Sequence, residues 1–353
     1  MLYTDEYLED LIKAVGQMAG IEALNGRTVF ITGATGMLCS GVADALLEMN
    51  RRGLLDTKLI LAGRNRERLC ERFGAFQEGK DFQFFQYDAA NPESLSFQAD
   101  YVIHGASNAH PAKIISEPVE TMLSNLNGLM ALLRAASNCG AKRLLYVSSS
   151  EVYGNIGERR PMKEDDYGFV DILNPRACYP SAKRAAETFC ISWMKEYGLE
   201  SVIVRPGHIY GPTVRREDSR ASAAFSWNAA DGEPIVMKSA GLQLRSYTYV
   251  ADCASALLTV LLKGAAGEAY NISNPDSIAS IREIADALAA AGQTEVVYEN
   301  PSDAEKSSFN LMSNSALNSD KLCALGWKGL FSLEEGCRRT IQVLKARISR
   351  EGE

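Results

Sequence analysis

Residues 28–36, Thr28-Val-Phe-Ile-Thr-Gly-Ala-Thr-Gly36, decide the fold. The apolar and β-branched run predicts a buried strand, and the glycines at its end predict a tight turn. Residues 37–49 carry apolar side chains at helical spacing, so a helix should begin at that turn. Glycines let a backbone approach a pyrophosphate, which a helix N-terminus favours. The pattern indicates a dinucleotide site, with an ordinary strand-to-helix turn as the alternative, because Cys39 occupies the place of the third fingerprint glycine.

A second informative stretch is Tyr179-Pro-Ser-Ala-Lys183. Residues four apart lie on one helical face, so this tyrosine and lysine can share a site. An ammonium beside a phenol stabilises the phenolate, which predicts that Lys183 lowers the tyrosine pKa from about 10 towards neutrality. Such a phenolate can act as a base on a carbinol. Taken alone, the pair is equally compatible with a solvated helix face.

The segments around these two motifs alternate between strand and helix patterns. The sequence predicts strands near 28–32, 58–62, 82–87, 101–104, 143–148 and 201–205, separated by helices near 37–49, 65–73, 119–138 and 181–197. Alternation with apolar strands predicts an α/β fold with a Rossmann-type, doubly wound parallel sheet covered on both faces. Ligands bind such sheets beyond the carboxyl ends of the strands.

The two ends of the chain follow different patterns. Residues 1–26 predict an N-terminal helical extension that serves packing or dimerisation. After Pro206, shorter strands near 234–237, 246–250, 269–272 and 295–298 mix with helices near 219–230, 252–263, 279–291 and 333–347. We therefore expect an NAD(P)-binding domain at 27–205, to which 240–275 is a candidate to return. A smaller mixed α/β substrate lobe is expected at 206–353, with mobile loops at 155–174 and 299–315.

Composition argues against several classes of protein. The 353 residues carry a net charge of −7 without a long Lys/Arg run, which argues against nucleic acid or an anionic membrane as a partner. Eight cysteines without a C-x-x-C pair and only three histidines predict reduced thiols and no metal site. No leader pattern and no apolar segment of ~20 residues is present. A soluble, cytoplasmic protein is expected.

Eight motifs occur in the order typical of one enzyme family. They are Gly33-Ala-Thr-Gly36, Val102-Ile-His-Gly-Ala-Ser107, Asn125-Leu-Asn-Gly128, Val147-Ser-Ser-Ser-Glu-Val-Tyr-Gly154, Tyr179-Pro-Ser-Ala-Lys183, Val204-Arg-Pro-Gly-His-Ile-Tyr-Gly-Pro212, Arg245-Ser-Tyr-Thr-Tyr-Val-Ala-Asp252 and Leu325-Gly-Trp327. From about Arg27 to about Ile348 the chain resembles the extended short-chain dehydrogenase/reductase family, in its nucleotide-sugar epimerase, dehydratase and decarboxylase branch. The resemblance implies a bound NAD(P), a nucleotide-sugar substrate and a homodimer.

The resemblance also implies catalytic roles. Ser149 would bind the reacting sugar hydroxyl, Tyr179 would remove the C4 hydroxyl proton, and Lys183 would hold the nicotinamide ribose. The chemistry agrees, because hydride transfer needs a base, a hydroxyl anchor and a cofactor within reach. Ser150 and Glu151 resemble the Thr-Ser-Glu element of UDP-glucuronate decarboxylases and GDP-mannose dehydratases. A carboxylate beside a 4-keto sugar can assist loss of water or of carbon dioxide, and Ser150 is a poor proton donor, which favours decarboxylation over dehydration.

Cofactor preference depends on the end of the second strand. Arg64 follows it where NAD sites carry an acidic residue, which favours the 2′-phosphate of NADP, whereas an exposed charged helix with Arg66, Arg68 and Arg72 is the alternative. The predicted cofactor contacts are Gly33, Thr35, Gly36, Met37, Leu38, Arg64, Asp88, Ala89, Gly105, Ala106, Ser107, Asn125, Tyr179, Lys183, Pro206 and His208. Asp88 would meet the adenine, and Asn125 would tether the active-site helix through water.

Substrate contacts follow from the same family pattern. They are Ser107, His110, Ser150, Glu151, His208 and Arg245, with Arg245 expected at the nucleotide diphosphate. Only Lys306 occupies the region where relatives place a second phosphate-binding arginine. Three functions stay open: a lyase or 4-epimerase that recycles its cofactor, a net NADP-dependent oxidoreductase, and a nucleotide-binding protein without catalysis.

Overall fold

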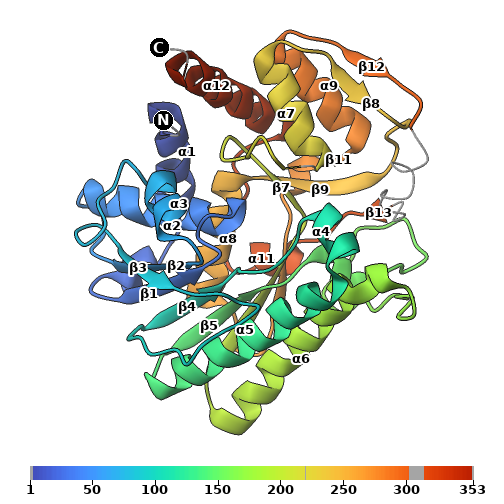
Figure 1. Cartoon of the computed structure of the whole chain (residues 1–353). Helices are drawn as coiled ribbons and strands as arrows, with labels where there is room; N and C mark the ends of the chain where they lie inside the picture. The colour runs from blue at the N-terminus through green and yellow to red at the C-terminus, as the bar shows by residue number, and fades with distance from the viewer. Residues whose placement is uncertain (1–2, 219, 302–313, 352–353) are drawn as a thin grey trace.

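A seven-stranded parallel sheet forms the centre of the protein in a computed structural model that describes residues 3–218, 220–301 and 314–351 (Figure 1). The strand order is β10-β6-β5-β4-β1-β2-β3, and all six neighbouring pairs are parallel. The strands are β1 (Thr28–Thr32), β2 (Lys58–Gly63), β3 (Gln83–Gln86), β4 (Tyr101–His104), β5 (Arg143–Val147), β6 (Glu200–Pro206) and β10 (Ala269–Ile272). The predicted α/β fold is confirmed. The order reverses between β1 and β4, where a ligand crevice is expected.

Helices cover both faces of this sheet. Helices α5 (Pro118–Asn138) and α6 (Cys178–Tyr197) lie together on one face, and α2 (Met37–Arg51) and α8 (Val250–Lys263) lie on the other (Figure 1). The alternation of strand side chains explains the two layers, because Val29 and Ile31 join one buried cluster and Phe30 joins the other. Helix α3 (Arg66–Arg72) follows β2, and the short helix α4 (Pro111–Ser116), which the sequence analysis missed, precedes α5.

The N-terminal helix α1 (Asp5–Gly16) packs within the chain, against α2, α8 and α12 (Leu333–Glu351). Its Tyr7 and Leu11 side chains are fully buried. The Tyr7 hydroxyl donates to the buried Asp44 carboxylate at 2.7 Å, and Arg72 pairs with the same carboxylate. Of the two roles predicted for this helix, the structure therefore shows packing.

A smaller region closes over the carboxyl ends of the sheet. It contains a four-stranded mixed sheet, made of β7 (His208–Tyr210), β9 (Leu244–Tyr249), β11 (Ile278–Ser280) and β13 (Asn314–Ser315), and the parallel pair β8 (Ile235–Met237) and β12 (Val296–Tyr298). Helices α7 (Ala221–Asp231), α9 (Ile281–Gly292) and α12 pack beside these strands, and α11 (Asp320–Cys323) lies near β10. Strand β10 itself completes the main sheet. Residues 302–313, which include Lys306 and most of the loop expected at 299–315, lie outside the described part.

None of the helices that the structure describes is long and apolar enough to span a bilayer. All eight cysteines are free thiols.

Candidate active site

The turn between β1 and α2 leaves little room for side chains at its two glycines. Gly33 has a φ of +68°, and a Cβ on it would lie 2.7 Å from the Gly105 carbonyl group at the end of β4. A Cβ on Gly36, the N-cap of α2, would lie 3.2 Å from the Gly33 oxygen. Met37 and Leu38 begin the helix. A bare backbone at the N-terminus of a 15-residue helix fits the pyrophosphate of a dinucleotide.

Cys39 accounts for the departure from the glycine fingerprint. Its buried sulfur fills the space beside Gly105, where any Cβ would collide with it. Burial raises the pKa of the Cys39 thiol to about 12, so the thiol stays protonated. Cys39 therefore packs α2 against the end of β4, and this packing requires a glycine at position 105.

A hollow of about 340 Å³ adjoins the glycine turn and is lined by Thr35, Gly63, Arg64, Asn65 and Arg68. The four neighbouring arginines separate into two kinds. Arg66 pairs with Glu78 at 3.0 Å, and Arg72 turns inward to Asp44, whereas Arg64 and Arg68 face the hollow. Two guanidiniums beside a cavity at the end of β2 fit an anionic group such as a 2′-phosphate. Arg64, Arg66 and Arg68 are all exposed, so the exposed-helix alternative stays open for these three residues.

The other predicted cofactor contacts lie at the ends of β3, β4 and β6. Asp88 and Ala89 follow β3, and the Asp88 carboxylate accepts the Ala90 amide at 3.1 Å. After β4, beyond Gly105 and Ala106, the Ser107 hydroxyl donates to the Asn125 Oδ1 at 3.0 Å, while the Asn125 Nδ2 donates to the Thr121 carbonyl at 2.7 Å. Asn125 thus positions Ser107 directly; its water-mediated tether to α6 stays a prediction. Pro206 ends β6.

Tyr179 and Lys183 lie one turn apart on the buried side of α6. The Lys183 Nζ is 5.8 Å from the centre of the Tyr179 ring and donates to the Val147 carbonyl at 2.8 Å. Ser149 is the N-cap of the 3₁₀ helix η2 (Ser150–Tyr153), and its hydroxyl hydrogen-bonds the Tyr179 phenol. The structure therefore brings together Ser149, Tyr179 and Lys183, as the sequence predicts, at the carboxyl end of β5.

The protonation of this group differs from the sequence-based expectation. Burial, reinforced by the Glu151 charge, raises the pKa of Tyr179 to about 12, although Ser149 and the cations Arg220 and Arg176 act in the opposite direction. Burial lowers the pKa of Lys183 to about 7. The expectation that Lys183 lowers the tyrosine pKa is therefore wrong for this arrangement, because the ammonium is itself costly in a buried site and donates its proton to a backbone carbonyl.

Glu151 is held by an arginine that the sequence analysis missed. Arg176, in the 3₁₀ helix η3 (Pro175–Ala177), forks onto Glu151 with two N–O contacts of 3.1 Å each. The side chains are 35% and 24% exposed, so the pair is open to solvent. The available signal was the position of Arg176, three residues before Tyr179 at the entrance to the same helix. Ser150, between the serine and the glutamate, is buried.

Cationic and imidazole side chains gather on β7, β9 and the start of α7, near Tyr179 and Glu151. Arg245 on β9 is buried, and no carboxylate in the described ranges forms an ion pair with it. Burial, together with the charges of Arg245 and Arg220, lowers the pKa of His208 to about 3, so its ring is neutral at physiological pH. The buried His208 Nδ1 has no hydrogen-bond partner within the described structure. A buried guanidinium beside an imidazole nitrogen that lacks a hydrogen-bond partner in the described structure fits an anionic ligand.

Two further groups lie near these side chains. Arg220, the N-cap residue of α7, pairs with Asp218 and was missed by the sequence analysis because neither residue belongs to a recognised motif. His110 is the N-cap of α4, and its charge contributes to lowering the pKa of Asp218, so it lies near the cluster.

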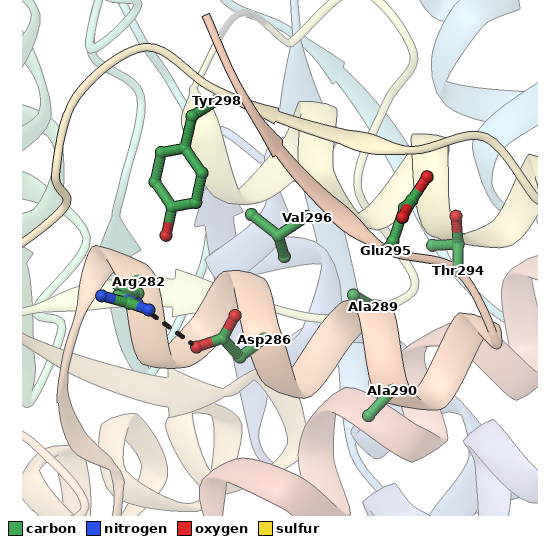
Figure 2. Close-up of a pocket in the computed structure, with 8 residues that line it drawn as sticks. All are labelled: Arg282, Asp286, Ala289, Ala290, Thr294, Glu295, Val296 and Tyr298. Atoms are coloured by element: carbon green, nitrogen blue, oxygen red, sulfur yellow. Dashed lines mark ion pairs between the residues drawn. The ribbon is translucent and has the colours of Figure 1, made fainter.

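A separate hollow of about 380 Å³ lies between α9 and β12 (Figure 2). It is lined by Arg282, Asp286, Ala289, Ala290, Thr294, Glu295, Val296 and Tyr298. Figure 2 shows Arg282 pointing towards Asp286, with which it forms an ion pair at 3.8 Å. None of the predicted site residues lines this hollow. Among the described residues, no cluster of three or more His, Cys, Asp or Glu side chains is arranged to hold a metal ion.

Comparison with known proteins gives consistent matches. The model of the NAD dependent epimerase/dehydratase family matches residues 29–273. UDP-glucuronic acid decarboxylase 1 of Xenopus tropicalis is 29% identical over 328 residues, covering 92% of this chain and 74% of the relative. A protein named probable dTDP-glucose 4,6-dehydratase, from Sinorhizobium fredii, is 28% identical over 332 residues, covering 89% of this chain and 91% of that protein.

Solved structures show the same fold. A variant of UDP-glucuronic acid 4-epimerase from Bacillus cereus, in complex with a fluorinated UDP-glucuronic acid and NAD, superposes with a TM-score of 0.75 at 20% identity, covering 91% of this chain and 99% of that chain. dTDP-glucose 4,6-dehydratase from Bacillus anthracis, in complex with NAD, gives a TM-score of 0.74 at 19% identity, covering 92% and 98%.

Proposed function

Because the chain belongs to the NAD dependent epimerase/dehydratase family, we propose that it is an NAD(P)-dependent enzyme that oxidises a nucleotide-linked sugar at C4 and then acts on the 4-keto sugar. Decarboxylation of UDP-glucuronate is the reaction that we favour, and 4,6-dehydration is the second candidate. The carrying observation is the cluster of Ser149, Tyr179 and Lys183 beside the glycine turn, with Glu151 next to it. The identity to UDP-glucuronic acid decarboxylases over 92% of the chain supports this choice.

In this proposal the residues of α6 and η2 handle the C4 hydroxyl. A nicotinamide held beside Tyr179 and Lys183 would supply the acceptor, and later the donor, of the C4 hydride. Tyr179 takes the hydroxyl proton while Ser149 hydrogen-bonds the same oxygen. Burial raises the pKa of Tyr179, and the Ser149 hydrogen bond together with the Arg220 and Arg176 charges offsets part of that cost.

We assign Glu151 and Ser150 to the step that follows oxidation, in which the 4-keto sugar reacts. In decarboxylation the C5–C6 bond breaks, its electrons move onto the C4 carbonyl, and the resulting enolate takes a proton at C5. Dehydration instead requires an acid that expels the C6 hydroxyl, and a serine hydroxyl at position 150 is a poor one. This difference favours decarboxylation, whereas the identity to the dehydratase of Sinorhizobium fredii keeps the second candidate in place.

The side chains on β7 and β9 supply anion recognition. We assign Arg245 and His208 to the nucleotide diphosphate, because a buried guanidinium that donates to a backbone carbonyl and forms no ion pair with a described carboxylate favours an anionic ligand. His110 and Ser107 are proposed to contact the sugar. Arg64 and Arg68 at the hollow support a preference for NADP over NAD.

We also propose that the protein is a homodimer that pairs through α5. This helix exposes four apolar side chains, Val119, Met122, Leu123 and Met130, and apolar patches of this kind mark interaction sites. Sedimentation velocity tests this assignment, and a monomer at micromolar concentration would contradict it.

Mass spectrometry of products from a panel of UDP-, GDP-, CDP- and dTDP-sugars tests the function. Loss of carbon dioxide from UDP-glucuronate is expected, and the Tyr179→Phe variant should give none. Loss of water indicates a dehydratase, and an isomer of unchanged mass indicates an epimerase. Stoichiometric change of absorbance at 340 nm indicates a net oxidoreductase. Absence of turnover together with absence of NAD(P) binding refutes the proposal.

A further inference from the structure

The ion pair between Arg176 and Glu151 is partly exposed, unlike the buried pair between Arg205 and Glu187. Within the described ranges, each side chain has the other as its only hydrogen-bond partner. Both N–O contacts are 3.1 Å, longer than the 2.7–2.9 Å typical of charge-assisted hydrogen bonds. The pair adjoins Tyr179, whose pKa responds to both members. A ligand that reaches Tyr179 therefore meets this pair.

A sugar carboxylate would compete with Glu151 for the guanidinium. The planar fork of Arg176 binds one carboxylate in bidentate geometry, and Glu151 already occupies that geometry. If Arg176 were free, a C6 carboxylate bound near Tyr179 could take the place of Glu151. The choice of partner by Arg176 thus determines whether the substrate carboxylate is itself held by a cation.

We propose that Glu151 withholds Arg176 from the sugar carboxylate, and that this withholding directs the reaction towards loss of carbon dioxide. This inference rests on the proposed function. A bound guanidinium stabilises the full charge of the carboxylate in the ground state. That charge leaves the carboxylate as the C5–C6 bond breaks, so the contact would be weaker in the transition state and would slow the step. Glu151 prevents the contact by occupying the fork.

The consequence is a defined pattern in a double-mutant cycle. Glu151→Gln releases a cation, so affinity for UDP-glucuronate relative to UDP-glucose should rise roughly tenfold. Arg176→Gln leaves an unpaired anion, so the same ratio should fall. The double variant is neutral, as the paired wild type is, and its ratio should match the wild type within about threefold. Dissociation constants are measured by calorimetry in a Tyr179→Phe background, which prevents turnover.

Carbon dioxide release gives an independent readout, measured in enzyme that keeps Tyr179 and can turn over. Glu151→Gln should form the 4-keto sugar but release carbon dioxide slowly, because the freed Arg176 holds the carboxylate. Adding Arg176→Gln should then restore release by roughly tenfold, a rescue that a merely structural role would not produce. The matched control is Arg338→Gln on α12, where Arg338 pairs with Glu335 at 53% and 36% exposure; it should change neither readout.

Three outcomes are decisive. The predicted rise with Glu151→Gln, together with rescue by the second substitution, supports the proposal. An unchanged ratio for Glu151→Gln means that Glu151 does not withhold Arg176 from the sugar carboxylate. A double variant that binds UDP-glucuronate more than tenfold less selectively than wild type means that Arg176 already contacts that carboxylate. Either result overturns the proposal. Failure of the wild type to bind or convert UDP-glucuronate refutes the proposed function instead, so the two failures are distinguishable.

Discussion

Two Arg–Glu pairs lie near helix α6, one between α6 and β6 and the other between η3 and η2, and they have the same charges but opposite surroundings. Glu187 and Arg205 meet at 2.6 Å with side chains only 11% and 8% exposed. Glu187 also accepts the Ser148 hydroxyl, and Arg205 also donates to the Tyr153 hydroxyl and a backbone carbonyl. The Arg176–Glu151 pair is open and makes no such additional contacts within the described ranges.

The difference teaches where each pair acts. Every charge in the buried pair is compensated by hydrogen bonds that link α6, β6 and η2, so its loss should be seen in stability. The open pair is partly exposed and lies beside Tyr179, so its loss should be seen in chemistry. We therefore expect the two pairs to separate function from stability, and the following variants test that separation.

Tyr179→Phe should have the largest effect, and on activity alone. Removing the phenol deletes the proposed base, which is worth about 10²–10⁴-fold in turnover. The free energy of unfolding should change by less than about 1 kcal/mol, because the ring is retained in its buried place. Steady-state kinetics and urea unfolding measure the two quantities. Tyr197→Phe, at the exposed end of the same helix, is the control, and a Tyr179→Phe enzyme with a tenth of wild-type turnover contradicts the assignment.

Glu187→Gln should show the opposite pattern. It leaves the Arg205 guanidinium buried without its carboxylate, at a cost of about 3–5 kcal/mol in unfolding free energy. Chemical denaturation measures this loss. The control is Glu200→Gln, which breaks the surface pair with Arg143 and should cost less than about 1 kcal/mol. Equal costs for the two substitutions would remove the distinction between buried and open pairs.

The buried Lys183 should impose a pH dependence on stability. Burial lowers its pKa in the folded protein to about 7 from 10.5, so between these pH values the unfolded chain binds a proton that the folded chain does not. Stability should therefore rise with pH across this window, by up to about 1.4 kcal/mol per pH unit. Urea unfolding of the cofactor-free protein at pH 7 and pH 9 should show this rise relative to Lys183→Met. Lys195→Met, exposed on the same helix, is the control, and equal slopes for wild type and Lys183→Met contradict the expectation.

Arg64→Gln tests whether an arginine at the hollow, unlike one paired with a glutamate, determines the preference for NADP over NAD. We expect the affinity for NADP to fall about tenfold relative to NAD, because Arg64 faces the hollow beside the glycine turn. Arg66→Gln, which removes a guanidinium paired with Glu78, should leave the ratio unchanged. Calorimetric titration with both cofactors measures it. A parallel loss for both cofactors would mean that Arg64 does not discriminate between them.

The sequence could predict the main sheet because its strands are apolar runs joined by helices of clear periodicity. Strands β7, β11 and β13 have only two or three residues each, and their pairing with β9 is non-local, so local pattern could not reveal them. Ser149, Tyr179 and Lys183 could be found because they belong to motifs. The position of Arg176 before Tyr179 could have pointed to the site, but its pairing with Glu151 could not be predicted, because that partner lies 25 residues away and is chosen by the tertiary fold.

The error over the Tyr179 pKa has a similar origin. Sequence spacing shows that Lys183 shares a helix face with the tyrosine, but not that both side chains are buried. Burial outweighs the charge at that depth, and it reverses the expected direction.

The central claim is that C4 of the sugar is oxidised and reduced within one binding event. UDP-glucuronate carrying deuterium at C4, incubated with the enzyme and unlabelled NAD(P), tests it most directly. Mass spectrometry of the product should show a UDP-pentose that has lost carbon dioxide and kept the deuterium. A product in which hydrogen has replaced the deuterium, with the label recovered in free reduced cofactor, would contradict the account.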